Sequence, residues 1–407
     1  MHIAVLSDPN NFHTQKWVRA LQDAGADATV FSFEENRHSE IPAVTLPAPY
    51  RFRGRYSYLS YLRGGKVLNA VLQAHRVDLI NALNITPFGV WAMRSQFRPL
   101  ILSALGADIL EYPPTGAGSP VLEFRSWSNI SGDRRWIARK RHQLMRRYYR
   151  RLVAQALRAG DLITGDNQYL IDCMEQWFAV PPAKLKLLRW GVEEKMFAAE
   201  AAELTTLRTE LGLRAEHRTI LSPRGAKAIY QGDIILAAFT KLLADRTLAV
   251  QCIMLSSGYA IDPAVKQAAQ QLAARDSRFV FVDQALPREK IYTLWNLVDV
   301  FISAPIYDGY SAAVAEGRYI GAVPVLNDIP ATRELFVHGE NGWICDPFTP
   351  EQLADDLGKI LRDLPRLKEK FARTNRAWIL EHSRVKNSAR MFLKWSENLL
   401  SSPQKPN

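Results

Sequence analysis

Cysteine is scarce in this sequence: the 407 residues include three, Cys173, Cys252 and Cys345, which lie far apart. Their odd number and wide spacing argue against a disulfide framework and suit a reducing compartment. No group of Cys and His residues has the spacing of a zinc site, so we expect no bound metal.

Long apolar runs are also absent, because no stretch approaches the roughly 18 apolar residues that a membrane-spanning helix needs. The first apolar run ends at Ser7-Asp8-Pro9 and is too short for the core of a signal peptide, so it predicts a first strand. Together with the cysteine content, this favours a cytoplasmic protein.

Several catalytic signatures are missing as well. The sequence has no Asp-x-Asp pair of the kind that holds a metal–diphosphate complex, no glycine-rich phosphate loop ending in Gly-Lys-Ser/Thr, and no Gly-x-Ser-x-Gly nucleophile turn. These absences argue against metal-clamped diphosphate chemistry, P-loop nucleotide hydrolysis and serine-hydrolase chemistry.

Positive charge, in contrast, is in excess, with a formal net charge of +11 at pH 7. Such an excess indicates a polyanionic partner: a nucleotide, a phospholipid surface or a nucleic acid. Residues 134–153 concentrate the charge, with nine Arg or Lys, no acidic residue and three aromatic residues in a helical pattern. We favour an anionic membrane surface as the partner of this stretch. A solvated helix whose apolar side packs on a sheet is the main alternative, and we expect no nucleic acid.

Hydrophobic periodicity predicts two successive α/β units, because short apolar runs alternate with helix-length segments twice along the chain. The predicted strands are residues 3–6, 28–33, 78–83, 100–104, 162–165 and 185–188 in the first series, and 219–222, 250–255, 279–282, 300–303 and 323–326 in the second. This rhythm predicts largely parallel, doubly wound sheets. We expect the junction between the units at about 190–204 and a helical tail from 350 with a break near 381–383.

Residues 298–330 predict a strand, a loop, a helix and a second strand in turn. Ser311 can cap the helix and Gly321 can end it. In an open α/β sheet, ligands bind beyond the carboxyl ends of the strands. A helix that starts there offers free backbone N–H groups and a positive dipole end, which suit a diphosphate.

Two carboxylates belong to this segment, Asp308 in the loop and Glu316 within the helix. A carboxylate accepts two hydrogen bonds at once and therefore matches a vicinal diol. The two groups are placed to bind hydroxyls at two ends of one ligand. The alternative is a surface Asp and a helix Glu that pair with Arg318 or Arg333.

Two cations, Arg224 and Lys227, follow the strand predicted at 219–222. They could hold a diphosphate and stabilise negative charge on it. The alternative is a loop whose Arg and Lys face solvent.

The carboxylate pair is the first of several ordered motifs. Asp308-x7-Glu316 is followed by Gly321-Ala-Val-Pro-Val, Asp328-Ile-Pro, Arg333-Glu334 and Gly339-Glu-Asn-Gly342. This order resembles the donor site of the family 4 glycosyltransferases, which have the GT-B fold. Asp308 replaces the first Glu of the family motif, and Lys227 lies closer to Arg224 than the family's Lys usually does.

The resemblance implies an α/β fold of GT-B architecture, with two Rossmann-like, doubly wound domains facing across a cleft. Residues 1–195 would form the acceptor-side domain, and the C-terminal helix within 383–407 would cross back to it. Residues 196–382 would form the donor-binding domain.

The implied activity is that of a retaining, metal-independent, hexosyltransferase-type enzyme without a cofactor. Its donor would be a UDP- or GDP-type nucleotide sugar, and its acceptor a hydroxyl of a glycan, a lipid-linked glycan or a small molecule. Peripheral binding to the inner face of the membrane would go with a lipid-linked acceptor. The alternative is a non-catalytic GT-B-fold binding protein or partner subunit.

The resemblance also implies roles for the donor-side residues. Glu316 would bind the ribose, Asp308 the transferred sugar, and Arg224 with Lys227 the diphosphate. The backbone at Gly309, Tyr310, Ser311 and Ala312 would lie close to sugar or phosphate oxygens, and Ser257, Gly258 and Asp283 are candidates for the nucleotide pocket.

Polar residues in the first half of the chain are candidates for the acceptor side. They are Asn10, Asn11, His13, Asp108 and Asn167. The family often has a glycine pair near Asn10 and Asn11, and it frequently has a His where Leu105 stands here. The missing His motivates the non-catalytic alternative.

Overall fold

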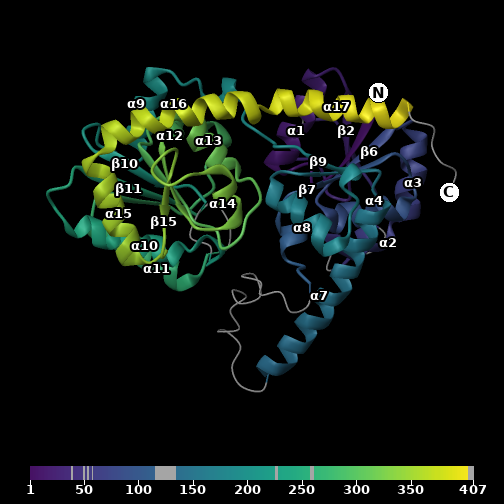
Figure 1. Ribbon diagram of the computed structural model, residues 1–407, viewed down its shortest axis with the longest axis horizontal. Helices are drawn as coiled ribbons and strands as arrows, with labels where there is room; N and C mark the ends of the chain where they lie inside the picture. The colour runs from purple at the N-terminus through teal and green to yellow at the C-terminus, as the bar shows by residue number, and fades with distance from the viewer. Residues whose placement is uncertain are drawn as a thin grey trace. The chain divides into compact units, whose positions relative to one another are not determined.

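The computed structural model describes residues 1–37, 40–48, 51–52, 55–56, 58–114, 134–224, 228–256 and 261–401. The chain divides into two compact units, Met1–Trp190 with Val385–Asn407 as unit 1 and Gly191–Arg384 as unit 2. Each unit is built on a parallel sheet flanked by helices (Figure 1), which confirms the predicted fold class. None of the helices in the described part of the chain is both long and apolar enough to span a bilayer.

The sheet of unit 1 has seven parallel strands in the order β3-β2-β1-β6-β7-β8-β9. They are β1 (His2–Leu6), β2 (Asp27–Ser32), β3 (Ala43–Thr45), β6 (Leu79–Leu83), β7 (Leu100–Ala104), β8 (Leu162–Gly165) and β9 (Leu185–Leu187), beside a separate antiparallel pair of β4 (Arg51–Phe52) and β5 (Arg55–Tyr56). Every residue of β6, β7 and β8 is buried. Helices cover both faces of such a sheet, which explains why these strands are almost continuously apolar.

The helices of unit 1 connect these strands, and the last one comes from the end of the chain. They are α1 (Phe12–Asp23), α2 (Tyr58–Arg63), α3 (Gly65–Ala74), a single π-helical segment (Ile85–Gly89), α4 (Val90–Ser95), α5 (Ala107–Leu110), α7 (Arg134–Ala159), α8 (Gln168–Phe178), a short 3-10 turn (Pro182–Lys184) and α17 (Val385–Ser401). Figure 1 shows α17 running along α1, which it contacts. The expected return of the C-terminal helix to the first unit is therefore confirmed.

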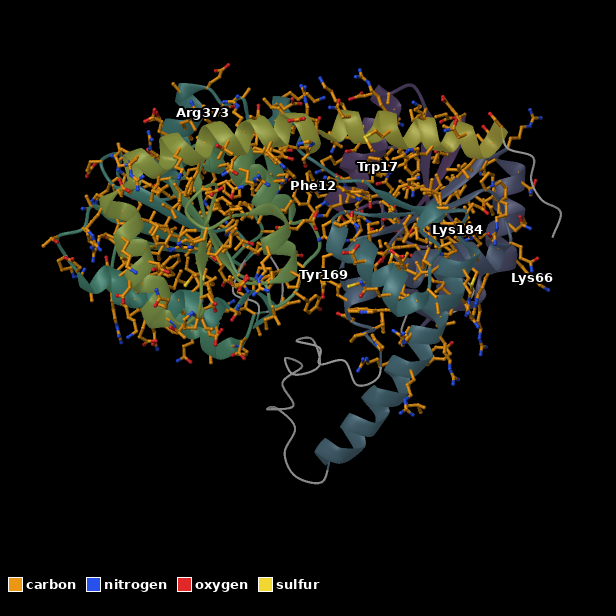
Figure 2. The ribbon with its side chains drawn as sticks, in the orientation of Figure 1. Phe12, Trp17, Lys66, Tyr169, Lys184 and Arg373 are labelled. Carbon is orange, nitrogen blue, oxygen red and sulfur yellow. The ribbon has the colours of Figure 1, made fainter. Side chains whose placement is uncertain are left out.

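Trp17 of α1 joins α17 to the sheet. Its buried ring lies 5.3 Å from Phe392 of α17 and 5.0 Å from Trp190, measured between ring centroids. Its indole N–H donates to Asn81 Oδ1 on β6 at 2.8 Å. Figure 2 labels Trp17 among the side chains beneath α17. The indole therefore contributes both apolar contact and a satisfied polar group to this core.

The sheet of unit 2 has six parallel strands in the order β12-β11-β10-β13-β14-β15. They are β10 (Arg218–Ser222), β11 (Val250–Leu255), β12 (Phe279–Val282), β13 (Val300–Ser303), β14 (Val323–Asn327) and β15 (Trp343–Cys345). Along the chain, β10, β11 and β12 follow one another toward one edge of the sheet. β13, β14 and β15 then follow one another from the other side of β10 toward the opposite edge. The place between β10 and β13 is the switch point at which sheets of this topology bind ligands.

The helices of unit 2 pack on both faces of this sheet. They are α9 (Ala201–Glu210), α10 (Gly232–Ala244), α11 (Pro263–Arg275), α12 (Arg288–Trp295), α13 (Ala312–Ile320), α14 (Pro330–Leu335), α15 (Pro350–Arg362) and α16 (Leu364–His382), with 3-10 turns at Glu194–Phe197 and Ala228–Tyr230. The expected break near 381–383 is present, since α16 ends at His382 and α17 begins at Val385.

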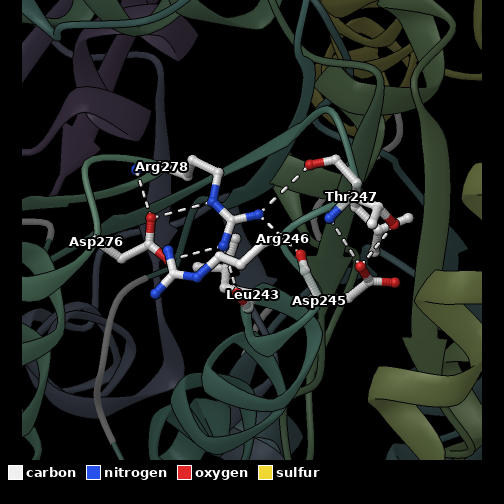
Figure 3. A network of polar contacts seen from close by, with 7 residues as sticks. Leu243, Asp245, Arg246, Thr247, Asp276 and Arg278 are labelled. Carbon is white, nitrogen blue, oxygen red and sulfur yellow. Dashed lines mark hydrogen bonds and ion pairs between the residues drawn. The ribbon is translucent and has the colours of Figure 1, made fainter.

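A buried network of hydrogen bonds and ion pairs lies at the end of unit 2 where β12 begins (Figure 3). Arg278 is 7% exposed and donates from Nε and Nη2 to Asp276, at 3.1 and 2.9 Å. It also donates to the carbonyl oxygens of Leu243 and Asp245, at the C-terminal end of α10. A cation there satisfies carbonyls that have no partner within the helix and complements its negative dipole end. Because this is the amino end of β12, the network serves the fold.

Each sheet has one edge strand that the sequence did not predict. β3 and β15 were not predicted, and each has three residues. Such short segments carry too little periodicity to be recognised, and each is held by pairing with one longer neighbour.

Candidate functional site

The switch point of unit 2 brings two predicted site residues together. Arg224 lies two residues beyond β10, and Asp308 lies in the loop that follows β13. β10 and β13 are paired in the sheet, so the two loops leave it side by side. Lys227, the other predicted cation of this loop, lies outside the described residues.

Arg224 and Asp308 form an ion pair between Nη1 and Oδ2. Both side chains are mostly buried, with 18% and 19% exposed. The guanidinium also donates from Nη2 to the Tyr230 hydroxyl at 3.0 Å and lies 4.1 Å from the centre of the Tyr230 ring. Burial lowers the pKa of Arg224, but Asp308 and Tyr230 outweigh it, so this pKa lies above its ordinary value. The site therefore presents a fixed, permanently charged cation.

The loop that carries Asp308 is held by its neighbours. Ile306 N donates to Ile229 O at 2.9 Å, and Gln231 Nε2 donates to Ala304 O at 3.0 Å, so the loop is tied to the segment after β10. Asn327 Nδ2, at the end of β14, donates to Pro305 O at 2.7 Å. These bonds restrict the backbone of the loop that carries Asp308.

Helix α13 starts at this loop as the sequence predicts. Ser311 is its N-cap and accepts from Val314 N at 3.4 Å, and Gly321 ends it with a φ of +85°. Gly317 allows the helix to lie close to β13, because a Cβ there would come within 2.4 Å of the Phe301 ring. The backbone of Ala312 belongs to the first turn, where N–H groups lack partners within the helix.

Glu316 lies on the inner side of α13 and is 4% exposed. Its Oε1 forms an ion pair with Arg288 Nη2, and its Oε2 accepts from the Trp295 indole N–H at 2.9 Å. The cations considered in the alternative interpretation have other partners. Arg318 Nε donates to Asn375 at 3.0 Å, and Arg333 pairs with Asp328. Sequence reasoning missed Arg288, because a lone Arg at the start of a helix gives no signal.

A small pocket opens beside Asp308. It is lined by Ser303, Pro305, Asp308, Gly309, Ser311, Val314, Leu326, Ile329, Ala331, Thr332, Leu335 and Phe336, and its free volume is about 20 Å³. The Ser303 hydroxyl and the Asn327 Oδ1 are buried in this region and have no hydrogen-bond partner among the residues that the structure describes. A volume of this size holds about one water molecule, so a larger ligand requires side chains to move. Tyr310 is buried nearby, with its ring 6.2 Å from that of Trp378.

Asp283, a further donor-side candidate, lies at the same edge of the sheet. Asp283 follows β12 and pairs with Lys266 at 2.7 Å, and its carbonyl accepts from Ser256 Oγ at 2.7 Å. Asp283 also lines an open pocket that runs along the edge strand β12 to Glu210. Ser257 and Gly258 lie outside the described residues.

Of the acceptor-side candidates in unit 1, Asn10 and Asn11 form local structure. The Asn10 side chain donates to Asp8 Oδ1 and Glu35 O and accepts from Arg37 N, which uses both its amide ends. Asn11 is the N-cap of α1 and accepts from His13 N at 2.8 Å. His13 lies in the first turn of that helix, with its ring 5.5 Å from that of Phe12.

The remaining acceptor-side candidates lie at the carboxyl edge of the sheet of unit 1. Asp108 is buried and accepts from Ile85 N at 2.7 Å and Leu105 N at 3.1 Å. Burial raises its pKa to about 6. Asn167 is the N-cap of α8 and accepts from Leu170 N at 2.7 Å, while its buried Nδ2 has no hydrogen-bond partner in the described part of the chain.

Metal-ligating residues do not gather in the described part of either unit: no three His, Cys, Asp or Glu side chains are arranged to hold a metal ion. In this region of unit 2, the described charged side chains instead form two ion pairs, Arg224 with Asp308 and Arg288 with Glu316.

Comparison with known protein families gives two matches. The family described as "Glycosyl transferase 4-like" matches residues 2–126, and "Glycosyl transferases group 1" matches residues 207–378. Together they cover most of the chain, one in each unit. No curated protein matches the sequence significantly.

Solved structures share the fold over the full length. Sucrose-phosphate synthase from Thermosynechococcus elongatus has a TM-score of 0.74 at 14% identity, covering 98% of this chain and 99% of its own. Anabaena Alr3699/HepE, solved with UDP and glucose, has a TM-score of 0.72 at 18% identity, with the same coverage. A glycosyltransferase from Rickettsia africae has a TM-score of 0.71 at 14% identity, again with that coverage. From the two family matches and this shared fold, the chain belongs to the family 4 glycosyltransferases of GT-B architecture.

Proposed function

We propose that the protein is a retaining glycosyltransferase that moves a hexosyl group from a UDP- or GDP-sugar to a hydroxyl of a glycan, a lipid-linked glycan or a small molecule, without a metal ion. The observation that carries the proposal is the pairing of Arg224 with Asp308 at the switch point, beside the start of α13. The UDP and glucose held by Anabaena HepE, a protein of the same fold, support a nucleotide-sugar donor.

Different side chains of unit 2 bind different parts of the donor. Arg224 and the N-terminal end of α13 neutralise the diphosphate, whose charge grows as the bond to the sugar breaks. Glu316 accepts from the ribose hydroxyls, and Asp308 accepts from a hydroxyl of the transferred sugar. The acceptor oxygen bonds to the anomeric carbon on the face from which the phosphate leaves, and the acceptor proton passes to the departing phosphate oxygen. The protein's part is to position the reactants and stabilise charge.

The test is transfer or hydrolysis of UDP- and GDP-sugars by the purified protein. Arg224→Ala and Glu316→Ala should each lower turnover by about 100-fold or more, because each removes a charged contact to the donor. Arg366→Ala, which breaks an exposed ion pair on α16, is the matched control and should leave turnover unchanged. Turnover should persist in a chelator, and the product should keep the anomeric configuration of the donor.

The outcomes separate the proposal from its alternative. A protein that binds a nucleotide sugar but turns none over would be a non-catalytic member of the family. A protein that binds none would contradict the donor site itself.

We also propose that α7 lies on an anionic membrane surface, on the cytoplasmic side. Leu144 is 68% exposed, Met145 41% and Tyr148 44%, and Arg147 and Arg151 are exposed on the same helix. Figure 1 shows this helix extending beyond the sheet of its own unit. Exposed apolar side chains between cations are typical of helices that bind anionic lipid.

Not every cation of α7 is available for lipid. Arg146 donates to Pro113 O, and Arg150 donates to the carbonyls of Tyr112 and Trp177, so these two fix the helix to unit 1. Leu144→Ser with Tyr148→Ser should weaken sedimentation with phosphatidylglycerol vesicles, while phosphatidylcholine vesicles should bind neither protein. Equal binding of the variant and the wild type to phosphatidylglycerol vesicles would contradict the proposal that α7 lies on a membrane surface.

A further inference from the structure

We propose that Arg288 is a positioning residue of the donor site, which fixes the Glu316 carboxylate in the orientation that recognises the two ribose hydroxyls. The inference rests on the proposed function, in which Glu316 binds the ribose. Arg288 belongs to none of the motifs that the chain shares with its family, and it comes from a different helix, α12.

Among the residues that the structure describes, Glu316 receives one hydrogen bond on each of its two oxygens. Arg288 Nη2 donates to Oε1, and the Trp295 indole donates to Oε2 at 2.9 Å. Each carboxylate oxygen can accept two hydrogen bonds. The contacts therefore leave one acceptor position on each oxygen, which is what a vicinal diol requires.

Arg288 is itself held in place by its own helix. Its guanidinium lies 4.5 Å from the centre of the Tyr292 ring, one turn further along α12. Tyr292 is buried, and its ring packs 4.9 Å from that of Phe197. Arg288, Tyr292 and Trp295 follow the spacing of one helix face. α12 thus presents two donors to Glu316 from a single rigid surface.

The burial of the Glu316 carboxylate explains why a cation lies beside it. A carboxylate as buried as Glu316 is costly unless it is paired and hydrogen-bonded. Without Arg288, the Trp295 indole would be the one donor left to Glu316 among the described residues, and one donor does not fix both oxygens. The side chain could then turn or take up a proton, and either change removes an acceptor from the ribose.

A double-mutant cycle on ribose recognition tests this role. The affinities for UDP and 2′,3′-dideoxy-UDP, or for GDP and its 2′,3′-dideoxy analogue where the wild type binds GDP instead, are measured by calorimetry for the wild type, Arg288→Met, Glu316→Gln and the double variant. The wild type should prefer UDP by about 10–100-fold, because it binds hydroxyls through a charged group. Arg288→Met and Glu316→Gln should each reduce this preference to less than about fivefold. The double variant should lose no more of the preference than either single variant does.

Two further variants keep the test decisive. Lys290→Ala removes a cation from the same helix that pairs with Glu210, and it should retain the full preference. Arg288→Lys keeps the charge without the planar fork, and it should retain an intermediate preference even if Arg288→Met does not fold.

The failures are distinguishable. A wild type that binds UDP and its dideoxy analogue equally, or binds neither UDP nor GDP, contradicts the proposed function and the inference with it. A wild-type preference that Glu316→Gln removes and Arg288→Met or Arg288→Lys leaves intact overturns the inference alone. Tighter UDP binding by Arg288→Met also overturns the inference. It would show that the Arg288 side chain occupies the place of the ribose and competes with it.

Discussion

Asp308 and the donor diphosphate compete for the same cation in the proposed function. In the structure, the Asp308 carboxylate pairs with Arg224, which also donates to the Tyr230 hydroxyl. Under the proposed function, a diphosphate would take over Arg224 and release Asp308 toward the sugar.

Asp308→Asn should therefore separate binding from turnover. UDP should bind about threefold to tenfold more tightly, because a competing negative charge is removed from a partly buried site. Transfer from UDP-sugar should fall by about 100-fold, because the contact to the sugar is weakened. Calorimetry and initial rates measure the two effects, with Asp363→Asn, an exposed ion-pair residue, as control. Weaker UDP binding by Asp308→Asn would contradict the competition.

Asp108 shows a different use of a buried carboxylate. It joins the loops after β6 and β7 by accepting from Ile85 N and Leu105 N. Burial raises its pKa from 3.8 to about 6, although these backbone bonds oppose the shift. A raised pKa in the folded state favours the protonated form. Its contribution to stability is therefore complete below about pH 4 and is lost as the pH rises through about 6.

Asp108→Asn should remove this pH dependence. The free energy of unfolding of the wild type, minus that of the variant, should be about 2 kcal/mol larger at pH 4.5 than at pH 7.5. The variant should also be less stable at both values, because its amide NH₂ faces a backbone N–H. Chemical denaturation at the two pH values measures the difference. The same difference at both values would show that Asp108 does not titrate in this range.

At the scale of the element, α13 depends on a close approach to β13. Gly317 lies against the Phe301 ring, which leaves no room for a Cβ. The same helix carries Glu316 and is capped by Ser311, so its distance from the strand sets the positions of the proposed donor contacts.

Gly317→Ala should push α13 away from the sheet and destabilise unit 2 by about 1–3 kcal/mol. UDP binding should weaken with it, because the contacts on α13 shift together. Gly358→Ala in α15 is the matched control: a Cβ there meets Arg362 at 3.6 Å, an ordinary contact, so it should leave stability unchanged or raise it. Thermal melting and calorimetry measure both effects. Equal stability of the two variants would contradict the tight packing.

At the scale of the whole molecule, the chain returns to its first unit. α17 follows unit 2 in sequence and contributes Phe392 to the core around Trp17. Unit 1 is therefore built from both ends of the chain, while unit 2 is continuous.

Phe392→Ala should destabilise unit 1 by about 3–5 kcal/mol, because it leaves a cavity beside Trp17. UDP affinity should remain, because the donor residues belong to unit 2. Met391→Ala, at the neighbouring and exposed position of α17, should change stability little. Thermal melting of the three proteins measures the loss. An unchanged melting temperature of Phe392→Ala would show that α17 does not stabilise the unit.

Local chemistry allowed much of this protein to be predicted from its sequence. The apolar run at 300–303, the cap at Ser311, the stop at Gly321 and the break before Val385 all act within a few residues of where they are read. Each is set by backbone hydrogen bonding or glycine's access to positive φ. The alternation of such segments was enough to predict two parallel α/β units.

Only the tertiary structure decided how charges are partnered. Arg224 meets Asp308 across 84 residues of chain because β10 and β13 are neighbours, and Arg288 meets Glu316 because α12 packs beside α13. The sequence offered Arg318 and Arg333 as partners for Glu316, since they are near it along the chain. Strand order and helix packing, which no short stretch encodes, determine which side chains share a site.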